Sequence, residues 1–106
     1  MATDDPITEG MAGRYASALF DLANEQKMLS EVEKDLTSFQ AMIDESDDLR
    51  ALVRSPVISR IDQGKALAAL IAKTGIKPTT GNFLQFISKN GRLFAIGDMI
   101  KAFRTL

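Results

Sequence analysis

The sequence predicts an all-α fold, a six-helix bundle, and three observations lead to this prediction. Apolar residues recur at spacings of three and four along most of the chain, which is the periodicity of amphipathic helices. Helix start signals and stop signals divide the chain into short segments. No segment alternates apolar and polar residues as a half-buried strand does. Because each apolar stripe must be buried against its neighbours, a bundle follows.

The first predicted helix contains the stretch from Arg14 to Ala23, and its apolar arc is unusually wide. At about 100° per residue the arc spans roughly 200°, against ~100° for a helix on the surface of a globular domain. It resolves into two stripes, Ala12, Ala16, Leu19 and Ala23 in one, and Met11, Tyr15, Ala18 and Leu22 in the other. One stripe can face a core, so the second must be covered by another helix or by another protein.

The second and third helices are predicted from caps and spacing. Ser30 followed by Glu33 is a capping box. The apolar residues behind it recur at spacings of 4, 3 and 4, namely Val32, Leu36, Phe39 and Ile43. Ser46 is the expected N-cap of a short helix whose apolar side is Leu49, Leu52 and Val53, and Pro56 ends that helix. The acids at 44–48 lack the ligand spacing of a calcium loop, so a solvated helix junction is predicted there.

The fourth helix is expected to start at the N-cap Ser59 and to end at Gly75, in the usual C′ position. Its expected apolar residues are Ile61, Leu67, Ala68, Leu70 and Ile71. The fifth helix is expected to be capped by Thr79 or Thr80 after the connector Lys77-Pro78 and to end at Asn90-Gly91. The last helix carries Leu93, Ile96, Ile100 and Phe103 on one face.

The fifth helix repeats the anomaly of the first, because Phe83, Leu84, Phe86 and Ile87 cover roughly 160° of its circumference. Two such helices side by side would leave a groove suited to an amphipathic helix of a partner. Wide arcs also occur on helices that lie centrally in a bundle, and the pattern alone leans towards that explanation. Tyr15, the single tyrosine, suits the edge of an interface or the margin of an ordinary core.

Composition argues against catalysis, metal binding and nucleic-acid binding. The chain has no cysteine and no histidine, so it lacks the commonest general base, metal ligand and thiol nucleophile. With 13 basic and 14 acidic residues the net charge is −1, which does not attract a polyanion. No cofactor, metal site or catalytic residue is predicted. A stand-alone helical regulatory or DNA-binding module is the alternative function, and an enzyme without histidine or cysteine is a more distant one.

The first ten residues contain three acids, Pro6 and Gly10, and are predicted to form a flexible arm ahead of a helical domain at residues 11–106. They lack the basic and apolar regions of a secretory signal. No apolar run in the chain reaches the ~18 residues needed to span a bilayer. We therefore expect the chain to begin in the cytosol or an equivalent space.

Three stretches of the chain together resemble one known family. Residues 13–23, Gly-Arg-Tyr-Ala-Ser-Ala-Leu-Phe-Asp-Leu-Ala, closely resemble the opening of the delta subunit of bacterial F-type ATP synthase. The mitochondrial counterpart of that subunit is the oligomycin-sensitivity-conferring protein. Residues 52–60, Leu-Val-Arg-Ser-Pro-Val-Ile-Ser-Arg, resemble its mid-domain linker. Residues 82–93, ending Ser-Lys-Asn-Gly-Arg-Leu, resemble its fifth helix and the turn that follows.

The resemblance implies a non-catalytic stator component whose six-helix N-terminal domain sits on the crown of the catalytic head. It implies that the N-terminal helix of an F1 alpha subunit binds between the first and fifth helices and so tethers the head to the peripheral stalk during proton-driven ATP synthesis. The partner-binding residues that it implies are Met11, Tyr15, Ala18, Leu19, Leu22, Phe83, Phe86, Ile87 and Asn90.

The resemblance also implies a second domain that joins the b subunits of the stalk, whereas this chain stops at Leu106. We therefore expect the C-terminal stalk-binding domain to be absent from this chain, which would grip the head without connecting it to the stalk. The acidic N-terminus is unlike an Arg-rich transit peptide. The expected location is the cytoplasmic face of the bacterial inner membrane, reached through partner subunits, with no direct membrane insertion and no nucleic acid.

Overall fold

The computed structural model describes residues 6–106, and its side chains from Gly10 onward. In this part of the chain every regular element is helical: α1 (Pro6–Glu25), α2 (Leu29–Glu45), α3 (Asp47–Arg54), α4 (Arg60–Thr74), α5 (Pro78–Lys89), the short 3-10 helix η1 (Leu93–Ala95) and α6 (Ile96–Arg104). The predicted all-α fold of six helices is therefore confirmed.

Half of the predicted N-terminal arm is helical. Its first five residues lie outside the described part of the chain, whereas residues 6–10 form the start of α1. Pro6 fits this position, because the fixed φ of proline suits the first turn of a helix and its missing N–H would have no partner there. The first helix therefore begins at Pro6 rather than at Met11.

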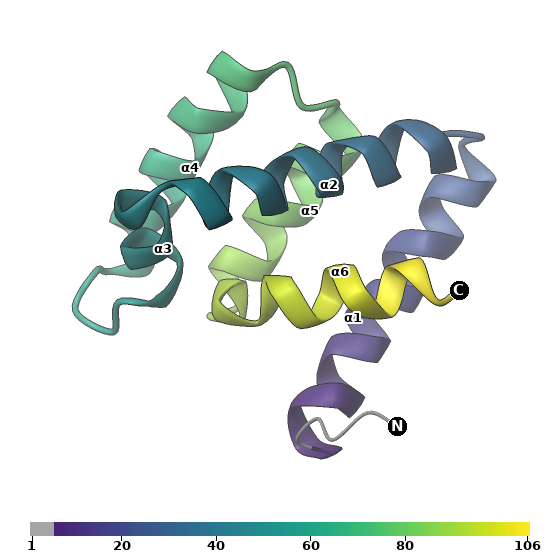
Figure 1. Ribbon diagram of the computed structural model, residues 1–106, viewed down its shortest axis with the longest axis horizontal. Coiled ribbons are helices and arrows are strands. Elements are labelled where there is room, and N and C mark those ends of the chain that lie inside the picture. Colours follow the sequence, from purple (N-terminus) through teal and green to yellow (C-terminus); the bar gives the residue numbers. More distant parts are fainter. Residues whose placement is uncertain (1–5) are drawn as a thin grey trace.

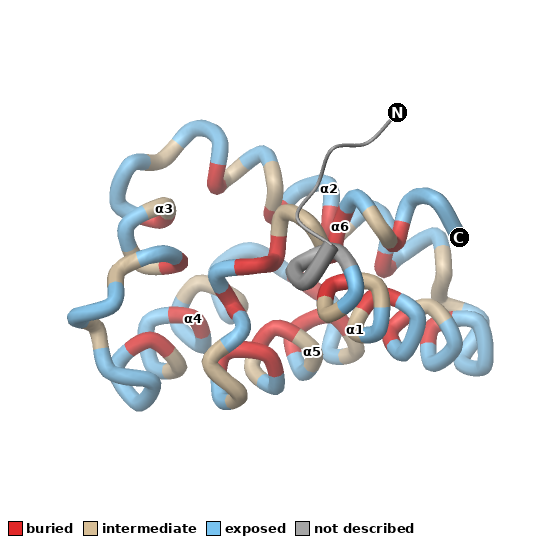
Figure 2. The backbone as a smooth tube through the Cα atoms, turned by 90° about the horizontal axis from the view of Figure 1, so that it is seen from below, coloured by how far each residue is buried: buried red, intermediate tan, exposed pale blue. Residues whose placement is uncertain are grey.

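The helices lie in two layers. α4, α5 and α1 lie side by side in one layer with α5 in the middle (Figure 2), and α2 and α6 cross over them in the other (Figure 1). Within this arrangement α1 packs on α6 and α4 packs on α5, while α3 contacts α2 and η1 at one end of the bundle. The topology thus makes neighbours of the first and fifth helices, which are far apart in sequence.

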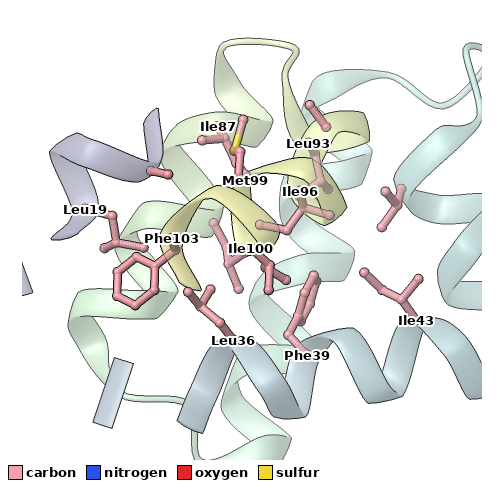
Figure 3. Close-up of a cluster of buried hydrophobic side chains, with 14 of the residues drawn as sticks. Leu19, Leu36, Phe39, Ile43, Ile87, Leu93, Ile96, Met99, Ile100 and Phe103 are labelled. Atoms are coloured by element: carbon pink, nitrogen blue, oxygen red, sulfur yellow. The ribbon is translucent and has the colours of Figure 1, made fainter. Parts of the chain in front are cut away.

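The core lies between the two layers, and α1, α2 and α6 contribute most of its buried side chains. Figure 3 shows Leu36 and Phe39 of α2 close to Ile96 and Ile100 of α6. The predicted apolar residues of both helices are buried: Val32, Leu36, Phe39 and Ile43 of α2, and Leu93, Ile96, Ile100 and Phe103 at the C-terminal end. Burying each large apolar side chain stabilises the fold by about 1.5–3 kcal/mol.

One of the two predicted stripes of α1 belongs to this core. Ala12, Ala16, Leu19 and Ala23 are at most 2% exposed. The alanines have little bulk beyond the backbone, so α6 can pack closely along this side of α1. Next to them Phe20 meets Phe103 of α6 with ring centroids 5.5 Å apart. The other stripe of α1 is left outside the core.

Most of the predicted helix boundaries are confirmed by the caps. The hydroxyl of Ser46 accepts the Leu49 N–H at 3.1 Å, and that of Ser59 accepts the Asp62 N–H at 3.1 Å. Gly75 ends α4 with φ of 74°, in the left-handed region that favours glycine. Ser55, the residue before Pro56, is the extended C-cap of α3.

The predicted capping box at Ser30 is wrong. α2 begins at Leu29, and its N-cap Met28 makes no side-chain cap bond. Lys27 has φ of 58°, and the Met28 N–H donates to the Ala23 carbonyl at 2.7 Å while the Lys27 N–H donates to Asn24 at 3.1 Å. These two bonds form a Schellman motif. Because this turn is so tight, α2 starts before Ser30 and places it in the first helical turn.

Two further expectations differ from the structure. Neither Thr79 nor Thr80 caps α5, because the helix begins at Pro78 with Lys77 as its N-cap. Ile61 was expected on the buried side of α4 but is 71% exposed, and the residues of α4 that are buried are Gln63 and Leu67. The Gln63 amide is accommodated in the interior because it donates to the Leu52 carbonyl at 3.0 Å and accepts from the Ser88 hydroxyl at 2.7 Å.

Candidate functional site

α1 and α5 lie next to each other and touch through side chains rather than through close packing of their backbones. We call the line of contact between them the seam. The rings of Tyr15 and Phe86 lie with centroids 6.1 Å apart and planes inclined at 58°. At one end of the seam the Asn90 amide donates to the Tyr15 hydroxyl at 3.3 Å. At the other end the Thr79 hydroxyl donates to the side-chain carbonyl of Gln26 at 2.6 Å. The helices are thus bridged at both ends of the seam.

Two adjoining hollows lie along this seam. The first, of about 300 Å³, is lined by Tyr15, Ala18, Leu19, Leu22, Gln26, Thr79, Asn82, Phe83 and Phe86. The second, of about 320 Å³, is lined by Met11, Arg14, Tyr15, Ala18, Phe86 and Arg92. Tyr15, Ala18 and Phe86 line both, so the two hollows adjoin at these residues. We call the residues of both hollows the α1–α5 groove.

Most of the residues predicted to bind a partner line this groove. From α1 these are Met11, Tyr15, Ala18, Leu19 and Leu22, and from α5 they are Phe83 and Phe86. Leu22 is 42% exposed and Phe86 is 55% exposed, so a large apolar area of the groove meets solvent. Leu19 is only 2% exposed and forms part of the floor. Ala18 is exposed, and its small side chain leaves room above the floor between Tyr15 and Leu22.

Two of the predicted residues lie elsewhere. Ile87 is fully buried, lines neither hollow and lies near Met99 in the core (Figure 3). The wide arc of α5 is therefore divided, with Leu84 and Ile87 facing the core and Phe83 and Phe86 facing the groove. Asn90 lines neither hollow and acts through its hydrogen bond to the Tyr15 hydroxyl.

The structure adds polar residues that were not predicted for this site. They are Arg14, Gln26, Thr79, Asn82 and Arg92. Gln26 follows Leu22 at a spacing of four, and Asn82 precedes Phe86 at the same spacing. Extending each apolar stripe by one helical turn into its polar neighbours would have identified both residues.

The lining of the groove suits binding rather than chemistry. From Gly10 onward no carboxylate lines it, and the titratable side chains that do are Arg14, Tyr15 and Arg92. Across the described residues no group of three or more His, Cys, Asp or Glu side chains is placed to hold a metal ion. Within the same part of the chain no helix is long and apolar enough to cross a bilayer. The arrangement offers apolar and aromatic area with a polar margin, which is typical of a protein-binding surface.

Fold and groove together define a small all-α domain of the helical-bundle class with an apolar surface groove between its first and fifth helices. Residues 11–106 match the family model described as the ATP synthase delta (OSCP) subunit. The chain belongs to this family.

Individual proteins agree with this assignment. The chain is 54% identical over all 106 residues to the ATP synthase subunit delta of Nitrobacter winogradskyi and 54% identical to that of Rhodopseudomonas palustris. It spans 57% of the length of each of these relatives. Among solved structures it resembles a chain in the cryo-EM structure of the Toxoplasma gondii mitochondrial ATP synthase hexamer. The two chains superpose with a TM-score of 0.81 and are 35% identical. The match covers 87% of this chain and 51% of the Toxoplasma gondii chain.

Proposed function

We propose that this chain is the head-binding part of the stator of a bacterial F-type ATP synthase and that its α1–α5 groove binds the N-terminal helix of an F1 alpha subunit. The observation that carries the proposal is the second stripe of α1. Its residues are half-buried or exposed, and it lies opposite the half-buried Phe83 and the exposed Phe86 of α5 across the groove. Membership of the delta (OSCP) family supports the choice of partner.

An amphipathic helix fits the dimensions and chemistry of this groove. A docked helix projects anchors at i, i+3, i+4 and i+7 along one face, and the two hollows provide consecutive places for such anchors. Ala18 allows the backbone of the guest to come close, while Phe83 and Phe86 supply aromatic area. A nanomolar contact corresponds to about −12 kcal/mol, and a few well-buried anchors supply most of such an energy.

The role that follows is mechanical. Torque from the rotor would turn the catalytic head unless a peripheral stalk held it, so the domain serves as a non-catalytic tether with a slow off-rate. Residues 11–106 would form the head-binding domain of this stator. The domain would then lie at the cytoplasmic face of the inner membrane, held there by the other subunits of the complex.

The experiment is a binding measurement with a synthetic peptide of the alpha subunit N-terminus. We expect the peptide to bind the chain by calorimetry and to become helical by circular dichroism. Ala18→Asp and Phe86→Asp each put a hydrated carboxylate where an apolar anchor of the guest helix would pack. Both should abolish binding, because that carboxylate would have to lose its water when the helix docks. The far-ultraviolet circular dichroism of both variants should remain that of the parent.

Matched controls come from the same residue types outside the groove. Ala41 is exposed on α2, and Phe94 is 52% exposed and lines a hollow beside α3 and η1. Ala41→Asp and Phe94→Asp should therefore leave the affinity unchanged. If both groove variants bind the peptide as tightly as the parent does, the groove is not the site.

A further inference from the structure

The two hollows of the α1–α5 groove differ in charge. The hollow between Leu22 and Thr79 is lined by apolar, amide and hydroxyl side chains and contains no ionisable group other than the Tyr15 phenol. The hollow at the other end is lined by Arg14 and Arg92, and residues 10–106 contribute no acid to it. The groove therefore has one neutral end and one cationic end.

The two arginines reach this end from opposite walls. Arg14 lies on α1, one residue before Tyr15. Arg92 is held by the turn after α5, where Gly91 has φ of 72° and the Arg92 N–H donates to the Ile87 carbonyl at 2.7 Å. This Schellman turn fixes the backbone of Arg92 against the end of α5. Both cations are thus carried by well-defined backbone on either side of the groove.

Arg14 and Arg92 are both exposed, and neither is paired with another of residues 10–106. Within residues 10–106 the ion pair that forms joins Arg50 and Asp47. The arginine side chains that donate hydrogen bonds within the same range are Arg50, Arg60 and Arg104. Arg14 and Arg92 are both exposed and make neither kind of contact there. Two cations of like charge beside an apolar hollow favour a ligand that brings negative charge to this end.

We infer that the helix bound in the groove presents a carboxylate side chain to Arg14 and Arg92, and that this contact fixes its direction and register. The inference rests on the proposed function of the groove. Apolar anchors alone tolerate a shift of one turn or a reversal, because apolar contacts are not directional. A carboxylate that accepts hydrogen bonds from guanidinium groups on both walls is strongly directional. A reversed helix would place this carboxylate against Gln26 and Asn82, where no cation meets it.

The experiment uses the 106-residue chain and the alpha-subunit N-terminal peptide, with each acidic residue of the peptide replaced singly by its amide. One replacement should weaken binding about two- to fivefold at low salt, which is the upper part of the range for exposed charge pairs. Arg14→Gln and Arg92→Gln should each weaken binding of the parent peptide similarly. When either arginine variant is tested with the amide-substituted peptide that binds more weakly, the loss of affinity should be smaller than the sum of the two single losses. The reason is that either change alone already removes the contact. Arg54→Gln, on an exposed arginine of α3, is the matched control and should change nothing.

The outcomes separate this inference from the function on which it rests. If the parent chain does not bind the peptide, or if Ala18→Asp and Phe86→Asp both bind it as tightly as the parent does, the proposed function fails. If binding occurs in the groove but Arg14→Gln, Arg92→Gln and every amide replacement bind within twofold of the parent, the proposed function stands and the carboxylate contact is overturned. If one acidic residue of the peptide does matter, but its loss of affinity adds fully to that of Arg14→Gln and to that of Arg92→Gln, the carboxylate contact is also overturned.

Discussion

Thr80 is a buried side chain whose hydroxyl oxygen has no hydrogen-bond partner among the described residues. A buried polar group without a partner costs about 1–3 kcal/mol of stability. Thr80→Val keeps the shape of the side chain and removes the polar atom. We therefore expect Thr80→Val to raise the free energy of unfolding by about 1 kcal/mol, measured by urea denaturation.

The adjacent threonine is the control for this prediction. The Thr79 hydroxyl donates to Gln26 at 2.6 Å, so Thr79→Val removes a bond that is made and should be neutral or destabilising. A loss of stability in Thr80→Val equal to that in Thr79→Val would show that the Thr80 hydroxyl is satisfied.

Gln63 is the opposite case, a buried polar side chain with a partner on each side. It links the Leu52 carbonyl of α3 to the Ser88 hydroxyl of α5. Gln63→Ala should lower the free energy of unfolding by about 2–3 kcal/mol, because it leaves both partners unsatisfied and opens a cavity. Urea denaturation of Gln63→Ala, Ser88→Ala and the double variant measures the coupling. Fully additive losses would mean that the hydrogen bond contributes nothing.

Single residues mark the limits of what the sequence predicts. Tyr15 was compatible with an interface edge or a core margin, and the structure places it half-buried where both hollows of the groove meet. Nothing in the sequence indicated that Gln63 would be buried, since a glutamine on a helix is usually solvated. Its burial depends on Leu52 and Ser88, which only the tertiary fold brings to it.

At the scale of the helix, the junction between α1 and α2 contains a local strain. Lys27 adopts φ of 58°, where a side chain with a Cβ atom is disfavoured and glycine is not. Lys27 is exposed, so its replacement removes no core contact. Lys27→Gly should raise the free energy of unfolding by about 0.5–1 kcal/mol, measured by thermal and urea unfolding.

Asn24 and Lys73 provide the comparison for Lys27. Both are exposed helical positions, at the end of α1 and of α4, where glycine has no conformational advantage. Asn24→Gly and Lys73→Gly should each be destabilising, because glycine in a helix costs about 0.5–1 kcal/mol relative to alanine. A destabilised Lys27→Gly would contradict the assignment of the left-handed turn.

Whole helices were predicted well because their signals are local. Caps at Ser46 and Ser59 and the turns at Gly75 and Gly91 depend on residues within one helical turn, and each lies where it was expected. The division of the wide arc on α5 was not predictable in the same way. Helical periodicity shows that Phe83, Phe86 and Ile87 lie on one broad face, but only the packing of α5 against α4, α2 and η1 decides which of them the core buries.

At the scale of the whole molecule, the sequence pattern predicted that two helices had more apolar surface than a core requires, and the fold makes them neighbours. That adjacency is a property of topology, because α5 comes to lie between α4 and α1 in one layer (Figure 2). Periodicity contains no information about which helices pair. The family resemblance predicted that the first and fifth helices form the two walls of a groove. That two arginines lie at one end of this groove is visible only in the three-dimensional arrangement.

The layered arrangement leads to a last prediction about stability. α1 packs on α6 and α5 packs on α4, while α1 and α5 meet through a few side chains across the groove. A helix bound in the groove adds contacts to both walls and exists only in the folded state. At a peptide concentration one hundred times the dissociation constant, linkage should stabilise the domain by about 2.7 kcal/mol. For a domain of this size that corresponds to a rise in Tm of roughly 10–20 °C.

Thermal unfolding with and without the alpha-subunit peptide measures this shift. Ala41→Asp should show the full rise in Tm with peptide, because the exposed side of α2 takes no part in the groove. Ala18→Asp should show none at the same peptide concentration, since its groove no longer accepts the helix. A Tm that rises equally in parent and Ala18→Asp would mean that the peptide stabilises the bundle from another surface, and α1 and α5 would then not be the walls of its site.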